Sequence, residues 1–275
     1  MACLRWRLRP TATPGVEQKE PQFTPLGTNF APGFGDPCDN DNINQGSANR
    51  AANCLGDGVP AGFNFNYDSS LQYLSGGNEA LKPESSDSIT LGGVLTPASL
   101  PGFSLSVDYY NITVDDVITS PTAQQVIDAC YGLPSLDNQF CALFDRAGAG
   151  GGPAGEIPGR ILEGDLELVP LNYAKLKVRG IDVEAAYRGR IPSIGRIDTK
   201  FIWTHALQND NFLDPTDPGR ADRILLELGD PEDAFNWKTN LQVGRFNLGY
   251  EMRYIGKMLI SIATYEDFFE LQGRE

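Results

Sequence analysis

Hydrophobic and polar residues alternate along six segments of the chain. In the first segment, Ile89 and Leu91 occupy one parity while Ser88 and Thr90 occupy the other. A period of two residues is typical of a β-strand that has one apolar face and one polar face. The pattern therefore predicts six strands, at residues 87–96, 103–114, 173–190, 196–207, 236–244 and 246–257.

Short and long connections alternate between these predicted strands. The short connections, at residues 97–102, 191–195 and 244–245, contain the proline and glycine that turns favour, and the long ones span residues 119–172 and 208–235. This order puts every long loop at one end of an antiparallel up-and-down meander, which a soluble sandwich need not do. We therefore predict an all-β fold in which about six strands form part of a larger transmembrane β-barrel with long extracellular loops. A secreted β-sandwich that binds carbohydrate or acts in adhesion is the alternative.

The parity of each strand also predicts the environment of its side chains. On the barrel interpretation the apolar parity faces lipid, and we expect this of Leu91, Leu105, Val183, Phe201, Leu241 and Tyr250. The polar parity faces the lumen, and we expect this of Asp182, Glu184, Arg188, Lys200, Lys238 and Arg253. Charged side chains in the lumen would join in one hydrogen-bonded network.

Few residues indicate catalysis. His205 is the only histidine, and it shares the parity of Trp203, so we interpret it as an interfacial side chain rather than as a catalytic base. Asp182 and Glu184 could suggest a glycosidase, but they lie on one predicted strand among basic residues of the same face. We predict no enzyme, no cofactor and no metal site.

The segments outside the predicted strands have little periodicity. Residues 1–86 are expected to form an irregular region with a long extracellular loop, and its acidic residues lack the glycine and glutamate of a calcium-binding EF-hand. We therefore expect a solvated acidic loop around residues 36–41. In the later long loop we expect helical turns at 121–130 and 136–146 and a flexible Gly-rich linker at 147–160.

The spacing of the five cysteines indicates whether the protein resides in an oxidising or a reducing compartment. Cys38 and Cys54 bracket a polar loop, Cys130 and Cys141 bracket a second one, and Cys3 has no obvious partner. The chain has no Cys-x-x-Cys pair, which argues against a zinc site. We predict two local disulfides, Cys38–Cys54 and Cys130–Cys141, formed in an oxidising compartment.

The net charge and the hydropathy of the chain argue against some classes of partner and of membrane segment. The formal net charge of −14 and the isoelectric point of about 4.5 make nucleic acid a poor partner. No run of 18 apolar residues is present, so no transmembrane helix is predicted. Residues 1–10 contain arginines but no apolar core of a signal peptide.

The segment from 78 to 118 contains an ordered set of residues that leads into one strand, namely Asn78, Leu81, Lys82, Pro83, Glu84 and Ser88. This set resembles the Asn-x-x-Leu-Lys-Pro-Glu segment and following strand in the later barrel of TonB-dependent outer-membrane receptors. A returning Asp-Tyr-Tyr-Asn-Ile strand is matched by residues 108–112. A further family strand is similar to this chain at Leu176, Gly180, Ile181, Asp182, Glu184 and Tyr187.

The resemblance implies a receptor in the outer membrane of a Gram-negative bacterium that takes up a scarce ligand, such as a siderophore, cobalamin or an oligosaccharide. Its partners would be outer-membrane lipid, the small-molecule ligand and the TonB complex, which acts through a plug domain. Neither the plug nor the terminal strands of the barrel are recognisable, and residues 1–22 match nothing in the family. We therefore expect a fragment from the C-terminal half of the barrel that does not function alone.

Overall fold

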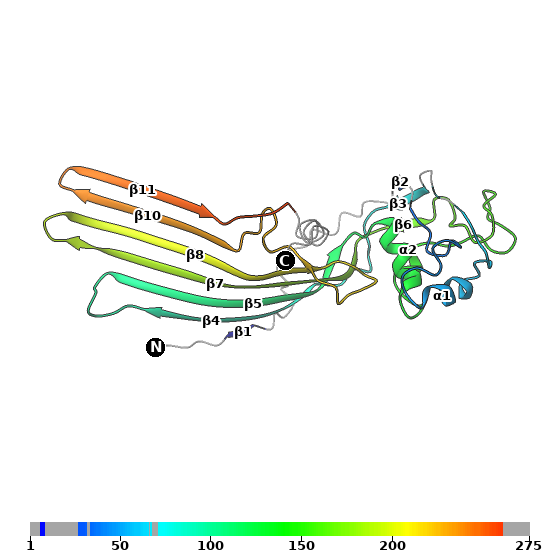
Figure 1. Cartoon of the computed structure of the whole chain (residues 1–275), viewed down its shortest axis with the longest axis horizontal. Helices are drawn as coiled ribbons and strands as arrows, with labels where there is room; N and C mark the ends of the chain where they lie inside the picture. Colours follow the sequence, from blue (N-terminus) through cyan, green and yellow to red (C-terminus); the bar gives the residue numbers. More distant parts are fainter. Residues whose placement is uncertain (1–5, 9–26, 32–33, 66, 68–70, 261–275) are drawn as a thin grey trace, which may run out of the picture.

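Six long strands run antiparallel and side by side in one sheet (Figure 1). They are β4 (Ser85–Leu95), β5 (Phe103–Thr119), β7 (Leu171–Ile191), β8 (Gly195–Phe212), β10 (Asp233–Val243) and β11 (Phe246–Ile255). Each pairs with the next along the chain, so the sheet is the predicted up-and-down meander. Two short strands join it, since β1 (Trp6–Leu8) pairs with β4 and β9 (Asp222–Arg223) pairs with β8.

The computed structural model describes residues 6–8, 27–31, 34–65, 67 and 71–260. Among these residues the sheet is open, because β11 pairs on one side only, with β10. The predictions that concern Cys3, most of residues 1–22 and the end of the chain lie outside the described residues.

The strands extend further towards the long loops than the alternation predicts. β5 continues past residue 114 to Thr119, and β8 continues past residue 207 to Phe212. Irregularities of register accompany both extensions, one between Val114 and Val117 on β5 and one on β8, where Leu207 is extra between the pairs Gly180–Ala206 and Arg179–Gln208. A bulge reverses the parity of the residues that follow it, so a strand continues although its alternation is broken. The long connections therefore span residues 120–170 between β5 and β7 and residues 213–232 between β8 and β10.

The short turn between β4 and β5 requires glycine at position 102. Gly102 has a φ of 87°, in the left-handed region that L side chains rarely adopt. A Cβ atom there would lie 2.0 Å from the carbonyl oxygen of Arg188. Instead the Arg188 amide donates a hydrogen bond of 2.8 Å to the Gly102 carbonyl, which holds the turn against the end of β7.

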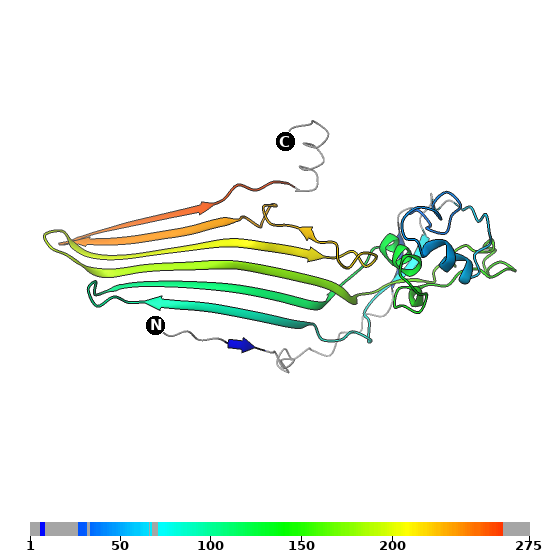
Figure 2. The same cartoon turned by 60° about the horizontal axis from the view of Figure 1, so that its bottom comes forward.

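Two long segments form a separate unit, which we call the loop domain (residues 27–75 and 120–170). Its elements are β2 (Gly27–Ala31), α1 (Arg50–Gly56), β3 (Leu71–Ser75), α2 (Ala123–Gly132), the 3-10 helix η1 (Cys141–Leu143) and β6 (Leu166–Leu168). β3 pairs antiparallel with β2 and parallel with β6. The loop domain lies beyond the sheet, at the end where the long loops emerge (Figures 1 and 2). Segments on both sides of the predicted boundary at residue 86 therefore contribute to one domain.

Helix α2 lies at the centre of the loop domain. Its first turn has a capping box, in which the Thr122 hydroxyl accepts a hydrogen bond from the Gln125 amide and the Gln125 side chain accepts one from the Thr122 amide. Val126, Ile127 and Tyr131 of this helix are completely buried. They share one core with apolar side chains of the earlier segment, which include Cys38, Cys54, Val59, Phe63, Tyr67 and Leu71.

The Gly-rich segment at 147–160 lies against this core, so the prediction of a flexible linker is wrong. Ala147 and Glu156 are buried, and the Glu156 carboxylate accepts a hydrogen bond of 2.9 Å from the Ala154 amide. Gly159 approaches Phe63 so closely that a Cβ atom would lie 3.0 Å from the ring. The segment is ordered by close backbone approach and by a buried carboxylate, which its shortage of large apolar residues does not reveal.

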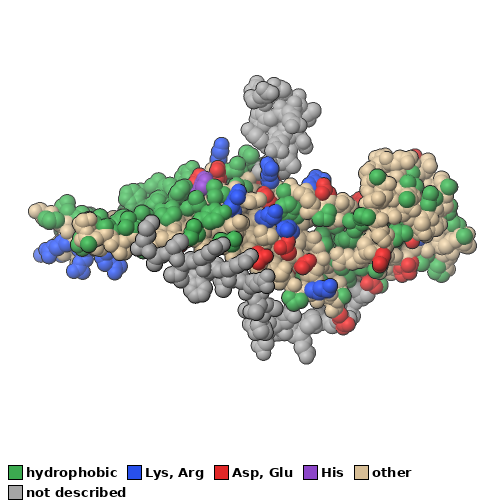
Figure 3. Space-filling view, turned by 90° about the horizontal axis from the view of Figure 1, so that it is seen from below, with side chains coloured by type: hydrophobic (Ala, Val, Ile, Leu, Met, Phe, Trp, Pro, Cys, Tyr) green, Lys and Arg blue, Asp and Glu red, His purple; other side chains and the backbone are tan. Residues whose placement is uncertain are grey.

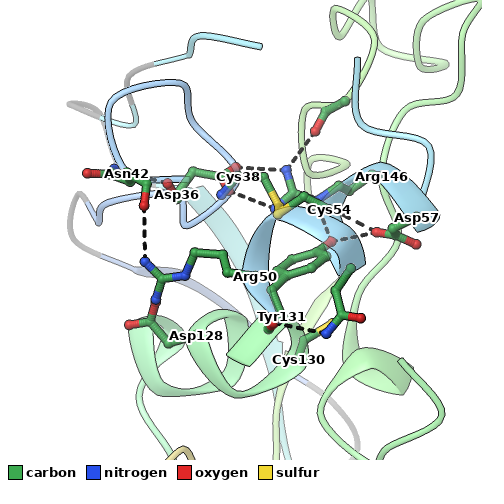
Figure 4. Close-up of a disulfide and its surroundings, with 12 residues drawn as sticks. Asp36, Cys38, Asn42, Arg50, Cys54, Asp57, Asp128, Cys130, Tyr131 and Arg146 are labelled. Atoms are coloured by element: carbon green, nitrogen blue, oxygen red, sulfur yellow. Dashed lines mark hydrogen bonds and ion pairs between the residues drawn. A yellow bond between two sulfur atoms is a disulfide. The ribbon is translucent and has the colours of Figure 1, made fainter. Parts of the chain in front are cut away.

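A buried ion pair joins the two segments of the loop domain (Figure 4). The Arg146 side chain is 3% exposed, and its guanidinium donates hydrogen bonds of 2.7 and 2.8 Å to the two carboxylate oxygens of Asp36. It also donates to the Tyr131 hydroxyl at 2.6 Å, and that hydroxyl donates to Asp57 at 2.5 Å. Burial alone would disfavour the charged guanidinium, but the Asp36 carboxylate outweighs burial and raises the pKa of Arg146.

The acidic loop around residues 36–41 is therefore not simply solvated, as the sequence led us to expect. Asp36 is buried against Arg146, and Asp39 is buried with its carboxylate accepting hydrogen bonds from the amides of Asp41 and Phe65. These carboxylates organise the protein's own loop. Among the described residues no group of three or more metal-ligating side chains is found.

Both predicted disulfides are present, Cys38–Cys54 and Cys130–Cys141. The first links the loop after Asp36 to helix α1, and the second links helix α2 to η1. In the chain-entropy model each short closed loop contributes roughly 3 kcal/mol to stability.

Asn172 contacts both the loop domain and the segment before β4, and its carbonyl oxygen accepts a hydrogen bond of 3.3 Å from the side chain of Gln139. Its side-chain amide donates hydrogen bonds to the carbonyl oxygens of Lys82 and Asp116, and its side-chain oxygen accepts from the Lys82 amide. Glu84 follows Lys82 by two residues, and its carboxylate accepts a hydrogen bond of 2.8 Å from the Ile118 amide. The Leu-Lys-Pro-Glu segment is thus clamped to the outer ends of β5 and β7.

None of the described helices is both long enough and apolar enough to cross a membrane.

Replacing Arg146 by glutamine should destabilise the loop domain by about 3 to 5 kcal/mol, because the substitution leaves Asp36 buried without a cation. Arg160→Gln is the matched control, since Arg160 pairs at 2.9 Å with Glu163 in a partly exposed position, and it should cost about 1 kcal/mol. Native-state hydrogen exchange of the buried amides of α2 measures both. Equal protection in the two variants would show that the buried pair has no special role.

Candidate functional site

The pairing register divides the side chains of the sheet between two faces. Residues paired directly across strands project from the same face, so Leu105, Ala185, Phe201 and Trp237 share a face. All six residues predicted to meet lipid lie on this apolar face: Leu91, Leu105, Val183, Phe201, Leu241 and Tyr250. All six predicted to line the lumen lie on the opposite, polar face: Asp182, Glu184, Arg188, Lys200, Lys238 and Arg253.

The apolar face is uncovered. Leu95, Phe246 and Leu248 are 57, 68 and 61% exposed, and no second sheet packs on this face among the described residues. Figure 3 shows hydrophobic side chains gathered along one side of the sheet, with Lys and Arg on the other side at the end of the short turns. A soluble sandwich would bury this face between two sheets, so the alternative of a β-sandwich is wrong.

The apolar face has a defined height. It extends from the short turns to the level of three paired residues, which are Ile181 on β7, His205 on β8 and Asp233 on β10. Below that level none of its described positions is charged. On β7 the band runs from Ile181 to Ile191, and ten residues at about 3.3 Å each, tilted by about 40°, rise roughly 25 Å. This equals the apolar band of an outer-membrane barrel.

Polar and aromatic side chains mark the upper edge of the apolar face. Trp203 Nε1 donates a hydrogen bond of 2.9 Å to the Asp233 carboxylate, and His205 Nδ1 lies 2.9 Å from the same oxygen. The Phe235 ring stacks on Tyr254 with centroids 5.1 Å apart. Aromatic belts occupy the interfaces of membrane barrels. The His205 ring contacts a carboxylate and an aromatic ring, those of Asp233 and Trp203, which fits the interfacial interpretation made from the sequence.

The charged residues of the polar face form small separate groups. Glu184 pairs with Lys200 at 3.0 Å, Arg188 pairs with Asp198 at 2.7 Å, and Asp182 accepts a hydrogen bond of 2.7 Å from Thr204. Further along the sheet, Glu251 accepts from Arg253 and pairs with Lys238 at 3.4 Å. The prediction of one connected network is therefore wrong, because each cation finds an acid on its own or the next strand.

A polar cleft of about 1250 Å³ lies between the loop domain and the segment at 213–223, which leads from β8 to β9. The loop domain contributes Ser47, Arg50 and Asp128 to its lining, and the segment contributes Asp214, Asp217, Arg220, Asp222 and Arg223. No aromatic ring lines it. Its lining brings together four carboxylates and three guanidinium groups, which are side chains capable of holding a polar ligand.

Ion pairs and hydrogen bonds shape both walls of the cleft. On the loop domain Arg50 pairs with Asp128 at 3.0 Å, and burial raises the pKa of the Asp128 carboxyl against the opposing effects of Gln124 and Arg50. On the segment the Thr216 hydroxyl and amide donate to Asp214 at 2.6 and 2.9 Å. Burial alone would raise the pKa of Asp214, but these hydrogen bonds outweigh it and lower the pKa.

Sequence reasoning missed the cleft. The sequence predicted the long loop at 208–235, which supplies one wall, but not the proximity of that loop to Gly132, where a Cβ atom would lie 3.7 Å from Thr216. The two walls lie on segments far apart in the chain and meet only after the loop domain has folded. An acidic run beside prolines, at 214–222, was the one available signal.

Residues 20–268 match the sequence model of a protein family described as "TonB dependent receptor-like, beta-barrel". No curated protein matches the sequence, and no solved structure matches the fold. The match covers the six long strands of the sheet and the loop domain.

Arginine at Ala185 should destabilise the sheet in a bilayer by about 2 to 4 kcal/mol, because Ala185 lies near mid-height of the apolar face. Ala186→Arg is the matched control, since the neighbouring alanine lies on the polar face beside Lys200, and we expect a change within about 1 kcal/mol. Urea unfolding in lipid vesicles measures both. A larger loss for Ala186→Arg would reverse the assignment of the faces.

Proposed function

We propose, from the premise that the chain belongs to the TonB-dependent receptor β-barrel family, that it captures a scarce ligand outside the cell for uptake across the outer membrane. The family consists of transporters and not of enzymes. The observation that carries the proposal is the uncharged apolar face, about 25 Å high, with short turns at one end and a ligand-sized cleft beyond the other.

On this proposal the apolar face meets outer-membrane lipid and the polar face lines the lumen. An uncharged exposed face is favourable in hydrocarbon, whereas Glu184, Lys200 and Lys238 require water or polar partners. Lipid also requires every backbone amide and carbonyl at membrane depth to be paired. The free edge of β11 therefore pairs with a further strand when the barrel closes.

The same orientation puts the loop domain outside the cell. The disulfides Cys38–Cys54 and Cys130–Cys141 support this, because they require an oxidising compartment. The ligand enters the cleft between the loop domain and residues 213–223, and the TonB complex, acting through the plug of the receptor, drives its passage. Siderophores, cobalamin and oligosaccharides are the ligand classes to consider. The cleft volume of about 1250 Å³ exceeds that of ordinary small-molecule pockets.

Thiol labelling on intact cells tests the orientation. In a Cys3→Ala background, Asp137→Cys on the loop domain should react with a membrane-impermeant maleimide on intact cells, because Asp137 is exposed on the outer side. Ser193→Cys, in the exposed turn between β7 and β8, should react only after the outer membrane has been permeabilised.

Gel-shift quantification of the labelled fraction gives the result for each variant. Equal reaction of both cysteines on intact cells would mean that the sheet does not span the membrane. Reaction of the Ser193→Cys variant alone on intact cells would mean that the sheet spans the membrane in the opposite direction, with its short turns outside the cell.

A further inference from the structure

Negative charge is concentrated at the outer end of the molecule. The described residues of 34–75 and 120–172 contain eleven Asp or Glu and three Arg, and residues 208–235 contain eight Asp or Glu and two Arg. The formal charge of the whole chain is −14, so these segments account for all of its negative excess and the rest of the chain is nearly balanced. A charged rim of this kind attracts ions of opposite sign and repels those of like sign before contact.

The cleft has its own excess of carboxylates. Two of its arginines are matched, since Arg50 pairs with Asp128 at 3.0 Å and Arg220 pairs with Asp214 at 3.6 Å. Asp217 and Asp222 also line the cleft, and neither has an ion-pair partner among the described residues. Arg223 is the single remaining cation of the lining. A ligand that enters the cleft therefore meets two available carboxylates and one available guanidinium.

We propose that the cleft takes a ligand of net positive charge, an organic cation with two or more ammonium or guanidinium groups. This rests on the proposed function, because the cleft faces the medium only if the loop domain is extracellular. The acidic outer surface steers the cation inward, and Asp217 and Asp222 hold it by charge-assisted hydrogen bonds. The lining has no aromatic ring on which an apolar or planar ligand would stack.

The choice of cation over anion follows from the same lining. An anionic ligand would need the three arginines, but two of them already have carboxylate partners that it would have to displace. It would also cross the acidic outer surface against repulsion. A neutral ligand would gain nothing from that surface, so its affinity would not depend on salt.

Titration calorimetry with capped tripeptides tests the proposal on the receptor purified from outer membranes in detergent. The probes are trilysine, triglutamine and triglutamate, which share a backbone and differ in charge. At low salt trilysine should bind at least tenfold more tightly than triglutamine, and triglutamate should not bind. Raising the salt concentration to about 0.5 M should weaken trilysine binding by about tenfold, because it screens the attraction.

A pair of double variants separates the cleft from the general acidity of the surface. Asp217→Asn with Asp222→Asn should weaken trilysine binding about tenfold. Asp41→Asn with Asp137→Asn removes the same charge from exposed loop-domain positions outside the cleft and should change the affinity less than threefold.

Equal losses in the two double variants would assign the binding to the surface as a whole and overturn the proposal. Triglutamine or triglutamate binding as tightly as trilysine, or no trilysine binding at all, would also overturn it. The titration uses purified protein and needs neither orientation nor energy coupling. If it fails while the thiol-labelling result holds, only the ligand class is wrong and the transport function stands.

Discussion

The apolar face of the sheet excludes charge, and this exclusion determines the register of the strands and the level of their turns. Over the described height between the short turns and the level of His205 and Asp233, every residue of that face is uncharged. A slip of one residue between β7 and β8 would carry Glu184 or Lys200 to the apolar face, so the register is strongly specified. Tight turns follow from the same constraint, because adjacent strands must begin at one level. Long insertions between strands are therefore possible only at the opposite end of the sheet, where the loop domain lies.

The loop domain is rigid for reasons unrelated to the sheet. The Arg146–Asp36 pair joins residues 110 positions apart, two disulfides close its inner loops, and α2 supplies the centre of its core. The Gln139 side chain of this unit donates a hydrogen bond to the Asn172 carbonyl at the start of β7, while Asn172 and Glu84 fix the segment before β4 to β5. One wall of the cleft is therefore a preformed surface. The other wall, at 213–223, is shaped mainly by its own turn contacts, such as those of Thr216 with Asp214. A ligand held between them would couple the loop domain to β8.

The elements that the sequence predicts well are those governed by local alternation. Ile89 and Leu91, or Val183 and Phe201, reveal their face because side chains in a strand alternate regardless of what surrounds them. The strand ends at Thr119 and Phe212 were missed because bulges reverse the parity there. The disulfides were predictable from short spacing. The Arg146–Asp36 pair, the ordering of residues 147–160 and the cleft were not, because each depends on contacts between distant segments that no local pattern encodes.

A nitroxide scan along β8, from residue 196 to 206, in lipid vesicles tests the central claim most directly. Each position in turn carries a spin label in a Cys3→Ala background, and its collisions with oxygen and with a water-soluble nickel chelate are measured. We predict a period of two, in which odd positions favour oxygen, most strongly near Phe201, and even positions such as Lys200 favour the nickel chelate. Accessibility without that period, or with the two parities exchanged, would contradict a membrane-spanning sheet with its apolar face in lipid.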